Sequence, residues 1–138
     1  MTKSIDKVKE YFASKQLKSD EVKNGEALRV GFSGMKNAGS VEIIVFFDED
    51  DGAIALRSFN LLTVDEEMKP KFYKLCSELN ARFRWIKFFV DEKDNTITVA
   101  EDAVTQLDSV GAETFELVLR MTRIIEDAYP ELMRAKFA

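Results

Sequence analysis

The chain has 138 residues and a mass of 15.8 kDa, and 46% of its residues are hydrophobic, which predicts a single domain over residues 1–138. It contains one cysteine and no histidine, so histidine-dependent catalytic triads and the usual zinc sites cannot be assembled from this chain. The formal net charge of -5 argues against a general nucleic-acid-binding protein.

The first half of the chain predicts a helix followed by a three-stranded antiparallel meander. Apolar residues at helical spacing place the helix at about residues 4–16, and the polar stretch Lys18–Glu26 predicts a connection. Alternating or β-branched residues then predict three strands, at residues 28–32, 41–47 and 53–59. The acidic residues and glycine at 50–52 suit a hairpin turn between the last two.

The second half predicts a helix, a second hairpin and a long final helix. Pro70 lacks a donor N–H, so the regular part of the middle helix should begin near Lys69. Cys76 lies in the apolar stripe of this helix and is predicted to be a core or near-core residue. The hairpin strands are expected at residues 84–90 and 96–101. The final helix is expected from about 112 to the end, with Pro130 kinking or restarting it.

This order of elements, αβββαββα, predicts an α+β fold with a five-stranded, mainly antiparallel sheet and three helices. The N-terminal residues MTKSIDKVKEYF lack the apolar stretch of a signal peptide, and no window approaches the roughly 18 apolar residues of a membrane span. We therefore expect a cytoplasmic protein.

Two stretches resemble a known family. They are Leu79–Asp91, with the sequence LNARFRWIKFFVD, and Ile124–Ala135, with the sequence IIEDAYPELMRA. Together with the order of elements, they resemble the YbjN-domain family, described as "putative bacterial sensory transduction regulator". The resemblance implies a fold like that of type III secretion chaperones, which commonly dimerise and hold protein partners. Because members have no established catalytic residues, it supplies no active site for this chain.

Acidic residues cluster in predicted turns, where solvated hairpin tips are favoured over metal sites. An EF-hand loop counted from Asp48 requires glycine at its sixth position and glutamate at its twelfth, whereas this chain has Ala53 and Phe59. Acid–base catalysis by two carboxylates needs one desolvated member, and the acid clusters all fall in predicted turns or helix starts. We therefore predict a non-enzymatic binding or regulatory module with no catalytic residue, metal or cofactor. A deep pocket that holds a desolvated acid beside Lys or Tyr would favour an enzyme instead.

Several predicted strands are apolar on both faces, which is the most informative feature of the sequence. One set of alternating side chains should face the helices: Val41, Ile43, Val45, Phe47, Ile54, Leu56, Ile86, Phe88, Val90, Ile97 and Val99. The other set predicts a surface for a second subunit or a protein client: Ile44, Phe46, Phe59, Trp85 and Phe89. A broad apolar arc on the final helix also suggests a subunit partner. We therefore predict a homodimer, with the alternative that the C-terminal helix or a long loop covers this face.

Arg57 and Lys87 are predicted to lie on the same face, interleaved with its aromatic residues. Aromatic rings that stack on bases, beside cations that meet phosphates, are typical of platforms for single-stranded nucleic acid. This is the alternative function of a different class. The net negative charge favours a protein partner, with the cations lying over a mostly buried surface.

Overall fold

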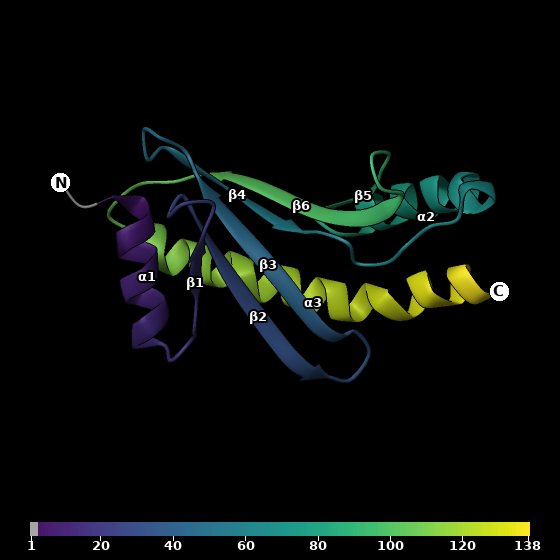
Figure 1. Ribbon diagram of the computed structural model, residues 1–138, viewed down its shortest axis with the longest axis horizontal. Helices are drawn as coiled ribbons and strands as arrows, with labels where there is room; N and C mark the ends of the chain where they lie inside the picture. The colour runs from purple at the N-terminus through teal and green to yellow at the C-terminus, as the bar shows by residue number, and fades with distance from the viewer. Residues whose placement is uncertain (1–2) are drawn as a thin grey trace.

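The computed structural model describes residues 3–138 as three helices on one face of an antiparallel sheet (Figure 1). In chain order the elements are α1 (Ser4–Ser14), β1 (Asp20–Val22), β2 (Ala27–Met35), β3 (Gly39–Phe47), β4 (Ala53–Ser58), the 3₁₀ turn η1 (Glu66–Met68), α2 (Lys69–Arg82), β5 (Lys87–Asp91), β6 (Thr96–Val104) and α3 (Val110–Phe137). The strands lie in the order β1-β2-β3-β4-β6-β5, so the second hairpin joins the meander through β6.

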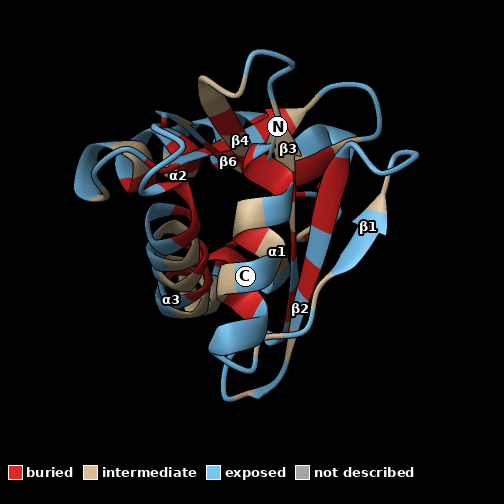
Figure 2. Ribbon diagram, turned by 90° about the vertical axis from the view of Figure 1, so that its left-hand side faces the viewer, coloured by how far each residue is buried: buried red, intermediate tan, exposed pale blue. Residues whose placement is uncertain are grey.

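The sheet has six strands, and the prediction of five is wrong because β1 lies in the polar stretch predicted to be a connection. This strand is only three residues long and pairs with β2 at the sheet edge, where its side chains are exposed or half-buried (Figure 2). A polar edge strand of this length lacks the hydrophobic alternation that reveals a strand in a sequence. Its turn to β2 uses left-handed backbone at Lys23, Asn24 and Gly25.

The predicted inner face of the sheet is confirmed. Leu56 and Phe88 are fully buried, as alternation in their strands requires, and Ile86, just before β5, is 2% exposed. The helices cover this face along the length of the molecule, with α1 near the N-terminal end of α3 and α2 at the opposite end (Figure 1). Phe115 of α3 packs edge-on against Tyr11 and Phe12 of α1, with ring centroids 5.6 and 6.0 Å apart.

The helix α3 is continuous through Pro130, so of the two predicted alternatives, a kink or a restart, the restart is wrong. Its broad apolar arc is used within the chain. Val118, Met121 and Ile125 are fully buried, and Leu117 and Ile124 pack against the same core. Because the helix contacts α1, α2 and β3, it needs a wider apolar face than a helix packed on one neighbour. The arc is therefore no evidence for a subunit partner.

The middle helix begins as Pro70 predicts, with η1 leading into α2 at Lys69. The following strand begins at Lys87, three residues later than expected, because Trp85 has left-handed backbone with φ of 70°. That conformation interrupts the strand alternation just before β5. None of the helices in residues 3–138 is long and apolar enough to span a membrane.

Candidate functional site

The sheet face that points away from the helices is here called the outer face. Strand pairing aligns six of its residues in one row across the sheet, which we call the central row. In order from β1 to β5 these are Asp20, Arg29, Ile44, Arg57, Ala100 and Lys87. The neighbouring row holds Phe46, Ala55 and Asp102. The outer face therefore mixes apolar and charged residues, and its central row ends in an acid at one sheet edge and a base at the other.

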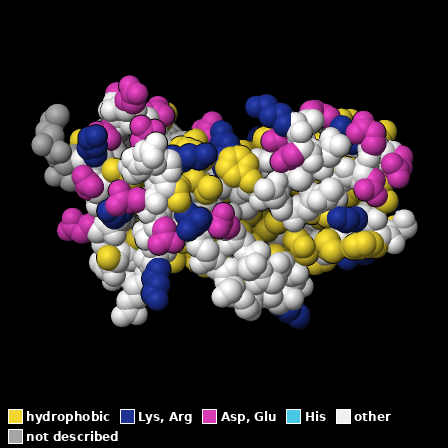
Figure 3. Space-filling view, viewed as in Figure 1, with side chains coloured by type: hydrophobic (Ala, Val, Ile, Leu, Met, Phe, Trp, Pro, Cys, Tyr) yellow, Lys and Arg dark blue, Asp and Glu magenta, His cyan; other side chains and the backbone are white. Residues whose placement is uncertain are grey.

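Aromatic rings flank the central row on the outer face. Phe46 and Phe59 meet edge-on with ring centroids 6.4 Å apart, although Phe59 is still 44% exposed. Phe89 of β5 is 42% exposed, and its register partner Thr98 is buried. In Figure 3, hydrophobic side chains gather over the middle of the visible face, with charged side chains around them. The helices pack on the opposite face, so the exposure of these rings is unusual for a sheet.

The cations of the outer face have acidic partners within the chain. The Arg57 guanidinium lies 2.7 Å from the Asp102 carboxylate, and Arg29 lies 3.4 Å from Asp20 and 3.9 Å from Glu42. Lys87 is exposed, and no acidic partner of it lies within 4.0 Å in residues 3–138. This pairing reduces the positive potential that a nucleic-acid backbone would require.

The structure brings Ile44, Phe46, Phe59 and Phe89 to the outer face but gives Trp85 a different place. Trp85 is 60% exposed and lines a groove between the end of β6 and the N-terminal half of α3. The expectation that it leaves through the same face as Phe89 is wrong, because its left-handed backbone lies outside the strand. In the sequence, the bulky FRW stretch between helix and strand gave no signal for this conformation.

Sequence reasoning also missed Glu101 as a candidate functional residue. Its place on β6, paired with Leu56, turns the side chain toward the inner face. The residue is 6% exposed, and its Oε1 atom accepts no hydrogen bond from residues 3–138. Burial raises the pKa of this carboxyl above the ordinary 4.5, although the charge of Arg120 acts in the opposite direction. The available signal was an acid among the inward-facing positions of β6, which are otherwise apolar (Ile97, Val99 and Ala103).

A second cluster of ionisable groups joins α2 to the β5–β6 hairpin. Lys69 lies 2.7 Å from Glu92 and 3.1 Å from Glu66, and the Tyr73 hydroxyl donates a hydrogen bond to Glu92. Lys69 and Tyr73 lower the pKa of Glu92 by hydrogen bonding to its carboxylate. A solvent-exposed acid with a lowered pKa is poorly suited to general acid catalysis. We therefore interpret this cluster as a surface ion-pair network.

Cys76 has the environment that its sequence position predicts. It is 5% exposed, and burial raises the pKa of its thiol to about 11. Because the thiolate is the nucleophilic form, little of this cysteine is in its reactive form at neutral pH.

The acidic turn at residues 48–52 is a hairpin tip between β3 and β4, as predicted. The Asp50 carboxylate accepts a hydrogen bond from the Gly52 backbone N–H at 3.0 Å. Asp51 accepts one from the Ser4 backbone N–H, also at 3.0 Å, which joins the tip to the start of α1. These carboxylates therefore have structural partners.

The fold is that of a small α+β domain with three helices on one face of an antiparallel sheet. The family model described as "YbjN: Putative bacterial sensory transduction regulator" matches residues 4–133, and the chain belongs to this family. A structure titled "Crystal structure of YbjN, a putative transcription regulator from E. coli" is similar, with a TM-score of 0.65 and 14% sequence identity, over 93% of each chain. A search of the curated proteins finds no match. The implied likeness to type III secretion chaperones stays a prediction.

Proposed function

We propose that this chain is a non-enzymatic regulatory module that acts through protein–protein contacts made by its outer face. The observation that supports this proposal is the pair of exposed rings, Phe59 and Phe89, on a sheet face opposite all three helices. Contiguous exposed apolar surface of this kind usually marks an interface, and large aromatic residues commonly act as its anchors. The family description as a regulator agrees with a binding role.

The occupant that we propose for the outer face is a second copy of the chain. The central row begins with the acid Asp20 and ends with the base Lys87. A two-fold axis that runs between two facing sheets, parallel to the strands, reverses the strand order of one copy relative to the other. Lys87 of each copy then faces Asp20 of the other, and Ile44 faces the aliphatic stem of Arg57. The row is complementary to itself in this arrangement.

A protein partner is favoured over single-stranded nucleic acid by the charges on the outer face. Arg29 and Arg57 already pair with acids, so Lys87 is the one cation of the central row that remains for a phosphate. Platforms for single-stranded nucleic acid combine stacked rings with a positively charged groove along the backbone. Steep salt dependence of binding to an RNA oligonucleotide, flattened by Lys87→Ala, would favour nucleic acid instead.

Sedimentation velocity of matched charge variants tests the proposed dimer. Lys87→Glu places two acids opposite one another at both ends of the interface, so the dissociation constant should rise about ten-fold or more. Asp20→Lys should weaken the dimer in the same way, and the double variant should recover most of the loss because the pair is exchanged.

Phe59→Asp tests the apolar centre of the same surface, and Phe137→Asp is its control. Phe137 is 73% exposed at the end of α3, on the helix side of the molecule. Phe59→Asp should yield monomer at concentrations where the Phe137 variant remains dimeric. Equal behaviour of the two variants, or no recovery in the double charge variant, contradicts the proposed surface.

A further inference from the structure

The groove beside Trp85 borders the proposed dimer surface, with which it shares Asp102, and has its own chemistry. It has a volume of about 480 Å³ and lies between the end of β6 and the first turns of α3. Its apolar wall includes Trp85, Ala103 and Leu117, and its charged residues are Glu101, Asp102, Glu113, Glu116 and Arg120. Four acids against one base make this groove negative.

Two of these acids are already used within the chain. Asp102 pairs with Arg57, and Glu113 accepts a hydrogen bond from the Ser109 hydroxyl. Glu101 and Glu116 have no ion-pair partner within 4.0 Å in residues 3–138. Glu101 is the more informative of them, because it is more than nine-tenths buried and its Oε1 atom is unpartnered. Such an atom costs stability unless something binds to it.

The indole of Trp85 supplies a second feature that suits a cation. The Arg84 guanidinium carbon lies 5.6 Å from the centroid of this ring, so the ring already attracts one positive group. The residue keeps a left-handed backbone, which is strained for a non-glycine residue, and the indole is 60% exposed at the groove. Strained residues that hold a side chain at a groove often belong to binding sites.

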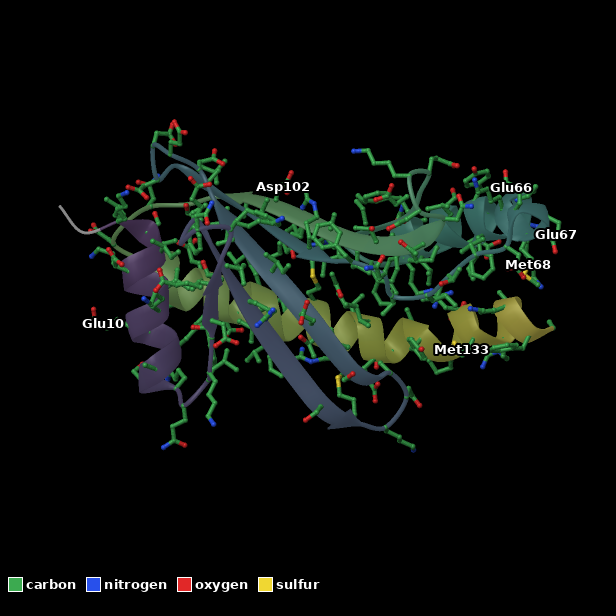
Figure 4. All side chains as sticks on the ribbon, in the orientation of Figure 1. Glu10, Glu66, Glu67, Met68, Asp102 and Met133 are labelled. Carbon is green, nitrogen blue, oxygen red and sulfur yellow. The ribbon has the colours of Figure 1, made fainter. Side chains whose placement is uncertain are left out.

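We propose that this groove binds an organic cation, a primary ammonium or guanidinium group on a short apolar stem. The cationic group meets Glu101 with Glu116 nearby, and the stem lies against Trp85 and Leu117. A free alkylamine and a lysine or arginine side chain of a polypeptide share this chemistry. Figure 4 shows Asp102, one of the residues that line the groove, on β6, and Glu67 far from it at the α2 end of the molecule.

The chain contains a built-in reporter for this site, because Trp85 is its one tryptophan. Its indole N–H gives a single resonance in a nitrogen-correlated NMR spectrum, which can be followed during titration at constant ionic strength. The probes are pentylammonium, pentan-1-ol and pentanoate, which match in stem and differ in charge. Ligands of this size reach a dissociation constant on the order of millimolar, so the titrations must extend to tens of millimolar. Saturable shifts with pentylammonium alone are expected.

Variants locate the cation within the groove. Glu101→Gln should weaken pentylammonium binding about ten-fold, Glu116→Gln should weaken it less, and Glu67→Gln should leave it unchanged as a charge-matched control. The Glu116 variant keeps the test informative if Glu101→Gln alters the fold. The N-acetyl methylamide of lysine distinguishes the two sources of the ammonium group. Tighter binding than pentylammonium indicates a lysine side chain of a polypeptide, whereas weaker binding indicates a free amine.

The proposal is overturned by several results of this titration. It fails if pentylammonium gives no saturable shift, or if pentan-1-ol or pentanoate binds as tightly. It also fails if both groove variants bind like the Glu67 control. These outcomes do not depend on the oligomeric state of the chain, which sedimentation of the same samples measures independently.

Discussion

At the scale of single residues, Trp85 combines an exposed ring with a backbone conformation that favours glycine. Because the indole is 60% exposed, Trp85→Ala should change the free energy of unfolding by no more than about 0.5 kcal/mol. Trp85→Gly should be more stable than Trp85→Ala by about 1 kcal/mol, since glycine adopts a φ of 70° without strain. Urea denaturation of both variants measures the difference. If the glycine variant is less stable than the alanine variant, residue 85 does not keep this strained left-handed conformation in solution.

Replacing the buried carboxylate of Glu101 should raise the stability of the fold and remove binding in the groove. Glu101→Met keeps the volume and removes an unpartnered buried acid, so the free energy of unfolding at pH 7 should rise by roughly 1–2 kcal/mol. Arg120 is left without the acid that its charge favours, which offsets part of the gain. The same variant should lose binding of organic cations in the groove.

The gain from Glu101→Met should depend on pH with a definite sign. Burial raises the folded pKa of Glu101, so the folded chain holds this proton more tightly than the unfolded chain does. Stability of the wild type therefore falls as pH rises from the ordinary carboxyl range through the raised folded pKa. The advantage of the variant should be small near pH 4 and larger at pH 7. An advantage independent of pH would mean that Glu101 has the same pKa in the folded and unfolded chain, as a well-solvated carboxyl does.

At the scale of elements, the contact between α1 and α3 depends on a glycine. A Cβ atom added at Gly111 would lie 2.8 Å from Tyr11 Cβ and 3.2 Å from the Lys7 carbonyl oxygen. Gly111→Ala should therefore lower the free energy of unfolding by about 1–3 kcal/mol. Gly31→Ala is the control, because nothing lies within 4 Å of its added Cβ. Thermal denaturation that ranks the two variants equally would contradict this packing.

The side chain of Asn80 on α2 protects the open edge of β5. Its amide accepts a hydrogen bond from the Phe88 backbone N–H at 2.6 Å and donates one to the Phe88 carbonyl at 3.0 Å. Asn80→Ala should cost roughly 1–3 kcal/mol of stability and speed hydrogen exchange at the Phe88 amide. Asn80→Asp keeps only the hydrogen-bond acceptor, so its stability should lie between that of the wild type and that of the alanine variant. Unchanged exchange in the alanine variant would show that this edge has another partner.

The elements also show what could and could not be predicted from the sequence. The inner face of the sheet followed from alternation in long strands such as β3, and the start of α2 followed from Pro70. The edge strand β1 is not predicted, because two acids and one valine are too few residues to carry a periodic signal. Trp85 was misplaced because a non-glycine residue with positive φ leaves no trace in a sequence pattern. The apolar arc of α3 was ambiguous, since burial within a chain and burial in a dimer require the same residues.

At the scale of the whole molecule, helices cover one face of the sheet and leave exposed rings on the other. The central claim is that a second copy of the chain occupies the outer face. Static light scattering of the wild-type protein at micromolar concentration tests this claim most directly. We predict a molar mass of twice the 15.8 kDa of the chain, returning toward the single-chain mass in the Phe59→Asp variant. A wild-type mass of one chain, without aggregation, would contradict the claim.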